Sequence, residues 1–228
     1  MLLFLSAAFA ATVQDLVVEM KALAAVHAGA PAVLADWHAL VDAHDLVDTP
    51  ATLAEYSRVR LAFEATRDGG LWGLRWAITN RDPTERYAWA SLIAWRGADV
   101  TAVAECDELS ALFASLARAM GVQEVGLFWP TWNHTVAVWT TPGVTKAVRI
   151  IVPTSQIYLS QGETLGTSGF NPATQRTIYR YGTTALPLDA ELSPEVYRRL
   201  LAPLAESAKP AEEVQLQRDA RAARVGGS

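Results

Sequence analysis

A single cysteine, Cys106, and a histidine at the start of a β-patterned segment, His134, are the residues of this chain whose types and placement could do chemistry together. A cysteine in the first turn of a helix faces free backbone N–H groups, and these favour the thiolate over the thiol. A histidine held opposite takes the thiol proton and leaves a thiolate–imidazolium pair. The pair therefore predicts nucleophilic attack by sulfur on an acyl group, with the imidazole as base.

Three carboxylates flank the cysteine, namely Glu105, Asp107 and Glu108, and they oppose its ionisation. A neighbouring negative charge disfavours a second one. We expect an imidazolium at contact distance to outweigh carboxylates that can point into solvent. The alternative interpretation is a purely structural Cys106, because a cysteine on a buried helix face is commonly a small apolar residue.

The pattern of residues around the cysteine predicts a helix from Glu105 to Met120, which would position its side chain. Its apolar positions recur at spacings of three and four, which places them on one face: Cys106, Leu109, Phe113, Leu116 and Met120. Gly121 follows, at the position where glycine usually ends a helix.

Beyond Gly121 the pattern becomes alternating, which predicts β-strands. One strand is centred on Val125 to Trp129, a second runs over residues 134–140, and a third over residues 146–152. In the second, His134 shares one side with Val136 and Val138, and the other side carries Thr135, Ala137 and Trp139. A sheet beside the cysteine's helix is therefore expected.

The segment Thr141-Pro142-Gly143 predicts the turn of a hairpin between the second and third strands. With Pro142 at its centre, His134 lies opposite Ile150, and Val152 or Thr154 extends along the same face. A slip of one residue would exchange the two faces of the strand.

The remainder of the chain is mostly helical by pattern, with helices expected over residues 13–29, 31–47, 52–67, 85–95 and 194–206. Residues 71–80 fit either a strand or a short helix, and residues 153–181 read as loop with short strands. His38 and Asp42 share a helix face, but no third ligand is placed by spacing, so we expect a solvated face and no metal.

The whole chain has 228 residues and a formal net charge of -5. That length suits a single domain, here residues 12–206, with a charged tail over residues 207–228. The mild acidity argues against a nucleic-acid partner. Residues 1–11 are apolar and end in Ala8-Phe9-Ala10, so they fit either a signal peptide of a secreted or periplasmic protein or a buried first helix of a cytoplasmic one. The run is too short to span a membrane.

Three segments in order resemble the motifs of the transglutaminase-like superfamily, which has a papain-like thiol fold. The segment Ala104–Val122 resembles its nucleophile helix, Trp132–Trp139 resembles its histidine strand, and Arg149–Thr154 resembles a third motif in which an aspartate precedes Pro-Thr. The likeness covers roughly residues 90–155. It implies an α+β fold, with N-terminal helices and a nucleophile helix packed on an antiparallel β-sheet.

The resemblance implies Cys106 as nucleophile and His134 as base, but it departs from the family at the third motif, where Val152 stands in place of aspartate. Valine cannot orient an imidazole, and loss of that group can cost several orders of magnitude in rate. Thr154 and Gln156 are the candidates for a neutral replacement.

Two tryptophans, Trp129 and Trp132, would either line a substrate cleft or cap the core. The expected function is thiol-dependent acyl transfer on a peptide or protein amide, by a protease, amidase, deamidase or transglutaminase-type reaction without a cofactor. The alternative is a catalytically degenerate binding or scaffold protein that has kept the fold.

Overall fold

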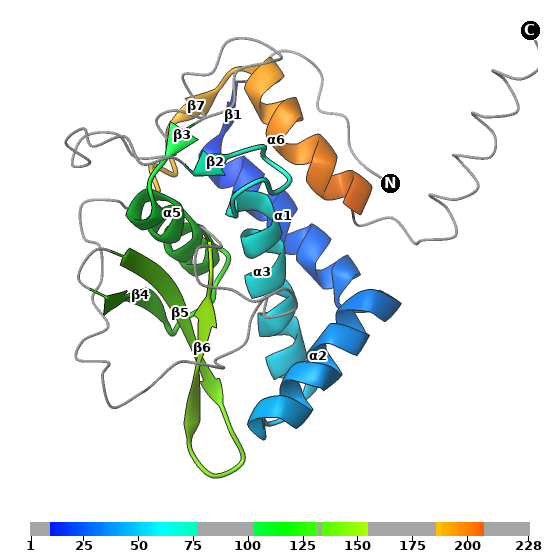
Figure 1. The fold of residues 1–228 in the computed structure, drawn as a ribbon. Helices are drawn as coiled ribbons and strands as arrows, with labels where there is room; N and C mark the ends of the chain where they lie inside the picture. The colour runs from blue at the N-terminus through cyan, green and yellow to red at the C-terminus, as the bar shows by residue number, and fades with distance from the viewer. Residues whose placement is uncertain (1–9, 77–102, 132–133, 155–185, 208–228) are drawn as a thin grey trace, which may run out of the picture.

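The computed structural model describes residues 10–76, 103–131, 134–154 and 186–207, which form an α+β fold (Figure 1). The side chains of residues 76, 103, 104, 129–131 and 134 are not among those described. Five helices and a three-stranded antiparallel sheet make up the bulk of the described chain. The predicted fold class, with N-terminal helices and a helix packed on an antiparallel sheet, is confirmed.

The N-terminal helices are α1 (Val13–His27), α2 (Pro31–His44) and α3 (Pro50–Thr66). The side chains of Thr12 and Thr49 accept a hydrogen bond from the backbone N–H three residues on, which caps α1 and α3. Proline in the first turn of α2 and α3 costs no hydrogen bond, because that N–H has no partner within a helix. All three predicted helices are confirmed.

Helix α5 (Cys106–Ala119) lies on a sheet formed by β4 (Val125–Thr131), β5 (His134–Pro142) and β6 (Ala147–Val152). The strand order is β4-β5-β6, so the strand that begins with His134 is the central one. Gly121 follows the helix with φ +93, a conformation that costs glycine nothing. The helix and the three strands agree with the sequence pattern.

Two short strand pairs and a last helix complete the described chain. Strand β1 (Ala11–Thr12) pairs antiparallel with β7 (Glu191–Leu192), and β2 (Arg75–Trp76) pairs parallel with β3 (Val103–Ala104). Helix α6 (Pro194–Ser207) follows β7 and packs against α1 (Figure 1). The first and the last described segments of the chain therefore lie side by side.

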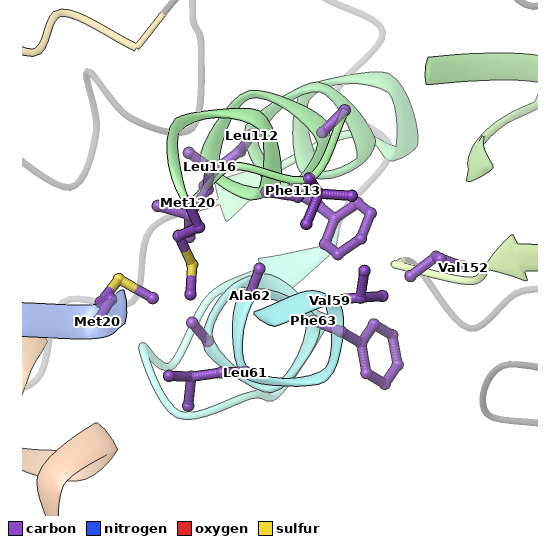
Figure 2. Close-up of a cluster of buried hydrophobic side chains, with 14 of the residues drawn as sticks. Met20, Val59, Leu61, Ala62, Phe63, Leu112, Phe113, Leu116, Met120 and Val152 are labelled. Atoms are coloured by element: carbon purple, nitrogen blue, oxygen red, sulfur yellow. The ribbon is translucent and has the colours of Figure 1, made fainter. Parts of the chain in front are cut away.

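The main core lies between α3 and α5, and Figure 2 shows their side chains facing one another. Helix α1 adds Met20 and strand β6 adds Val152 to this cluster. The labelled members are all apolar and nearly or fully buried: Met20, Val59, Leu61, Ala62, Phe63, Leu112, Phe113, Leu116, Met120 and Val152. Burial of this surface is the main force that fixes α5 against both α3 and the sheet.

A row of aromatic side chains ties α2 and α3 to the sheet. The Trp37 and Tyr56 ring centroids lie 5.2 Å apart, and those of Tyr56 and Trp139 lie 6.2 Å apart. The indole N–H of Trp37 donates to Asp48 over 2.7 Å, and that of Trp139 donates to Glu55 over 3.2 Å. Each buried indole thus keeps a hydrogen-bond partner.

The β5–β6 hairpin is longer than the sequence predicts. Pro142 is the last paired residue of β5, opposite Ala147, and the loop is closed by a hydrogen bond of 3.1 Å from the Gly143 N–H to the Lys146 carbonyl. The carbonyl of Pro142 also accepts from the Val47 N–H over 3.0 Å, which holds the strand end against the α2–α3 connection. The predicted turn at residues 141–143 is wrong, because these tertiary contacts extend the strand through the proline.

The longer hairpin changes the register. Ile150 lies opposite Trp139 rather than opposite His134, and Val152 lies opposite Ala137. Val152 therefore shares a face with Ala137 and Trp139, not with Val136 and Val138 as the predicted register required.

Several predictions concern residues outside the described ranges. These are the signal-peptide or helix assignment of residues 1–9, the helix at residues 85–95, most of the loop at residues 153–181 and the tail from residue 208. Of the ambiguous segment 71–80, the structure describes a two-residue strand, Arg75–Trp76, which follows a turn.

Candidate active site

Cys106 is the first residue of α5, and its side chain is partly exposed. The preceding residue, Glu105, has an extended backbone and occupies the N-cap position of the helix. The Glu105 N–H donates to the Glu108 carboxylate over 2.9 Å, and the Glu108 N–H donates to the Asp107 carboxylate over 2.9 Å. The acidic residues that surround the cysteine in sequence thus serve to start the helix on which it sits.

The sulfur of Cys106 meets the beginning of strand β5. A hydrogen bond from the backbone of Thr135 lowers the pKa of the thiol, and a second from the backbone of Asp107 acts in the same direction. A hydrogen bond that lowers the pKa of an acid must be donated to it, so both partners are N–H groups. Thr135 directly follows His134, and the structure therefore brings the nucleophile's helix to the backbone beside the predicted base.

Burial is the largest influence on Cys106 and raises the pKa of its thiol. The carboxylates of Asp107 and Glu105 raise it further, and the two backbone hydrogen bonds only partly offset these effects, so the net shift is upward. Burial likewise raises the pKa of Asp107, which the Glu108 backbone hydrogen bond opposes. These described groups favour the thiol over the thiolate. The side chain of His134 lies outside the described part.

One turn along α5 from Cys106, Ser110 anchors the helix to the sheet. The Ser110 hydroxyl donates to the Thr135 carbonyl over 3.2 Å and lies 2.7 Å from the Thr154 hydroxyl oxygen. Because the Ser110 proton points to Thr135, the Thr154 hydroxyl donates to Ser110. Ser110 and Thr154 are fully buried, and Thr135 is nearly so.

Thr135 belongs to none of the residue pairs of the sheet. On one side, Phe128 of β4 pairs with Val136 and Thr131 pairs with His134, so the register shifts between them. On the other side, the pairs with β6 end at Ala137 and Val152. Ser110 of α5 thus contacts the Thr135 carbonyl at the point where the ladder is irregular, and β-bulges are over-represented beside active sites.

The sheet has two buried faces. Ala137, Trp139, Ile150 and Val152 belong to the main core with α5, whereas Phe128, Val136 and Val138 form a separate cluster. The alternation predicted for β5 grouped His134 with Val136 and Val138. That grouping would place the predicted base on the second cluster's face, so its approach to Cys106 depends on the irregular start of the strand.

Of the remaining predicted site residues, the structure describes some and not others. Thr154 is next to Ser110, where its hydroxyl is hydrogen-bonded. Val152 is fully buried in the main core. Its partner across the ladder is Ala137, which lies three residues after His134. The side chain of Trp129 and all of Trp132 and Gln156 lie outside the described residues.

Sequence reasoning missed Ser110 and Thr135. Ser110 carried a signal, since it lies four residues from Cys106 on a helix that is otherwise apolar on that side. A buried serine in a helix needs a partner, which the sequence alone does not name.

No protein-family model, no curated protein and no solved structure matches this chain. The likeness to the transglutaminase-like superfamily thus stays a prediction that depends on the three motifs. Within the described residues, no group of three His, Cys, Asp or Glu side chains could hold a metal ion. No single helix of the described ranges has the length and apolar character of a membrane span; only α1 and α2 taken together, bent by 80° at their junction, meet that criterion.

Proposed function

We propose that the protein catalyses thiol-dependent acyl transfer on amides, with Cys106 as nucleophile and His134 as base. The observation that carries the proposal is the contact of α5 with the start of β5, where the Ser110 hydroxyl, one turn after Cys106, donates to the carbonyl of Thr135 beside His134 over 3.2 Å. The Thr135 backbone also lowers the pKa of the Cys106 thiol. The partial exposure of Cys106 supports it, because a nucleophile must reach its substrate. The order and spacing of the three motifs support it as well.

The reaction proceeds in two acyl-transfer steps. His134 removes the thiol proton, and the sulfur attacks the amide carbonyl carbon, so that a carbon–sulfur bond forms. The carbon–nitrogen bond then breaks, and the proton passes from His134 to the leaving amine. Water or an amine then gives a proton to His134 and attacks the thioester carbon, the carbon–sulfur bond breaks, and the sulfur takes the proton back as the acid or the new amide leaves. Backbone N–H groups at the start of α5 stabilise the oxyanion. The substrate class is a peptide or protein amide.

A second candidate is a degenerate scaffold or binding protein with this fold. Two observations favour it: burial and the adjacent carboxylates raise the pKa of Cys106, and the position of the family's aspartate holds Val152 inside the apolar core. A thiol that stays protonated has no nucleophilic role, and a core valine gives an imidazole no partner. This candidate requires that replacement of Cys106 or His134 leave the protein's function unchanged.

The test is acylation by 4-nitrophenyl acetate, followed by ammonia release from a glutamine-containing peptide. The proposal predicts a burst of 4-nitrophenol and one acetyl group on Cys106 by mass spectrometry in the wild-type chain. His134→Ala should slow the burst about 100-fold or more, as expected for loss of a general base. Equal, slow acetylation of the wild-type and His134→Ala proteins would reject the acyltransferase and favour the scaffold.

A further inference from the structure

The junction between α5 and β5 contains a chain of buried hydroxyl groups that neither the proposed nucleophile nor the proposed base explains. It runs from the Thr154 hydroxyl to the Ser110 hydroxyl over 2.7 Å, and from there to the Thr135 carbonyl over 3.2 Å. Polar groups in a protein interior are costly unless they are fully hydrogen-bonded. Apolar residues would fill this space without that requirement. The presence of these hydroxyl groups therefore indicates that the orientation of α5 relative to β5 has to be fixed.

We propose that Ser110 and Thr154 are positioning residues, which hold the first turn of α5 against the start of β5 and thereby place Cys106 beside the strand that carries His134. This inference rests on the proposed function and adds to it the device that aligns the site. Ser110 and Cys106 are four residues apart on one helix, so their side chains lie on the same face one turn apart. The Ser110 hydroxyl donates to the Thr135 carbonyl, and the backbone of the same strand residue lowers the pKa of the Cys106 thiol.

Hydrogen bonds are directional, whereas apolar contacts tolerate small displacements. The main core holds the remainder of α5 by apolar packing, which is not directional. A displacement of about 1 Å at a catalytic group can cost about 100-fold in rate. The Ser110 contact removes this freedom at the turn that bears the nucleophile.

Thr154 connects the end of β6 to the Ser110 hydroxyl. Pro153 follows the last residue of β6, and the Thr154 N–H then donates to the Val152 carbonyl over 3.1 Å. The chain turns there, and Thr154 comes to lie against α5 rather than continuing along β5. Three elements thus meet through a single serine hydroxyl.

The groups around the thiol set the expected readout. Glu105 and Asp107 of α5 raise the pKa of Cys106, and the Thr135 N–H lowers it. On β5, the titratable residue at this junction is His134. A helix that moves away from β5 loses the Thr135 hydrogen bond and the approach to His134, whereas the carboxylates move with the cysteine. The pKa of Cys106 should therefore rise.

The experiment measures the rate of Cys106 alkylation by iodoacetamide against pH in the full-length chain. Ser110→Ala and Thr154→Val should both raise the apparent pKa of the thiol and slow alkylation below that pKa about tenfold, which corresponds to one pKa unit. The limiting rate at high pH should stay within about twofold, because the thiolate itself is unchanged.

Two matched variants separate positioning from general loss of structure. Thr154→Ser keeps the hydroxyl and should retain the wild-type profile, whereas Thr154→Val keeps the shape without it. Ser115→Ala removes another buried serine hydroxyl of α5, more than two turns from Cys106, and should leave the profile unchanged. If Ser110→Ala fails to fold by circular dichroism, the Thr154→Val and Thr154→Ser pair decides the question.

Profiles of Ser110→Ala and Thr154→Val that match the wild type, or that show faster alkylation, would overturn the positioning role. The same assay distinguishes this failure from a failure of the proposed function. A His134→Ala variant with a wild-type profile, beside a shifted Ser110→Ala variant, would remove His134 as base while the alignment of Cys106 on Thr135 stands.

Discussion

The two ends of helix α5 are built on different principles. Its C-terminal half presents Leu112, Phe113 and Leu116 to an apolar core shared with α3 (Figure 2). Its N-terminal turn carries Cys106, whose thiol pKa is lowered by the Thr135 backbone, and one turn on lies Ser110, which donates to the Thr135 carbonyl. The first end is held by buried area, and the second by a few directional bonds.

This difference indicates that one end of α5 contributes mainly to the free energy of folding and the other mainly to the orientation of Cys106. Burial of apolar area is the main source of free energy and is largely indifferent to small shifts. A polar junction contributes little net free energy, since its hydrogen bonds replace bonds to water, but it fixes orientation. Substitutions at the two ends should therefore have opposite signatures, one in stability and one in thiol reactivity.

The largest expected effect is on stability at the apolar end. Phe113→Ala should lower the free energy of unfolding by roughly 3–5 kcal/mol, because it leaves a cavity in a fully buried site. Cys106→Ala at the other end should change it by about 1 kcal/mol or less, because the residue is partly exposed. Urea unfolding monitored by circular dichroism measures both. Equal losses in the two variants would break the comparison.

The apolar interior should also be sensitive to alkaline pH through Tyr56. Burial raises the pKa of Tyr56 to about 12, above the value of about 10 for an exposed tyrosine. The unfolded chain therefore loses the phenol proton first, and stability that is complete below about pH 10 is lost as pH rises to about 12. The loss amounts to roughly 2–3 kcal/mol.

The measurement for Tyr56 is the unfolding free energy against pH in the Cys106→Ala background, since the raised thiol pKa gives a loss of the same sign. Tyr56→Phe should remove most of the slope between pH 10 and 12. A Tyr56→Phe variant with an undiminished slope would show that another group carries the alkaline transition.

The smallest expected effect is at the polar end. The charge of Asp107 raises the pKa of Cys106, so Asp107→Asn should lower that pKa and speed alkylation a few-fold at pH values below it. Asparagine keeps the oxygen that accepts from the Glu108 N–H, so the helix start is preserved. Asp42→Asn on the exposed surface of α2 removes the same charge elsewhere and is the control. An unchanged rate in Asp107→Asn would show that the carboxylate does not influence the thiol.

The sequence was sufficient for the elements that rest on local patterns. The helices from Val13, Pro31 and Cys106, and the strands on both sides of His134, have regular apolar spacing and local start or stop residues such as Thr12, Pro31 and Gly121, so local rules place them. The α+β class follows from that order of helices and strands.

The register of the hairpin could not be predicted, because it depends on contacts between distant segments. Pro142 and Gly143 look like a turn when taken alone, but the α2–α3 connection is hydrogen-bonded to Pro142 and Val144, on either side of Gly143, and this pairing lengthens the strand. The hydroxyl chain of Ser110 has the same cause, since its partners Thr135 and Thr154 come from two other elements. Local composition carries no information about such partners.

The most direct test of the central claim is the pH dependence of Cys106 alkylation in the wild-type chain and in His134→Ala. If His134 activates the thiol, the wild-type reactivity rises at a pH at least about one unit lower than in the variant. The described surroundings of Cys106 favour the thiol, so early ionisation requires a further group, and the proposed function assigns that role to His134. Identical curves in the two proteins, both rising above the ordinary pKa of cysteine, would contradict the account.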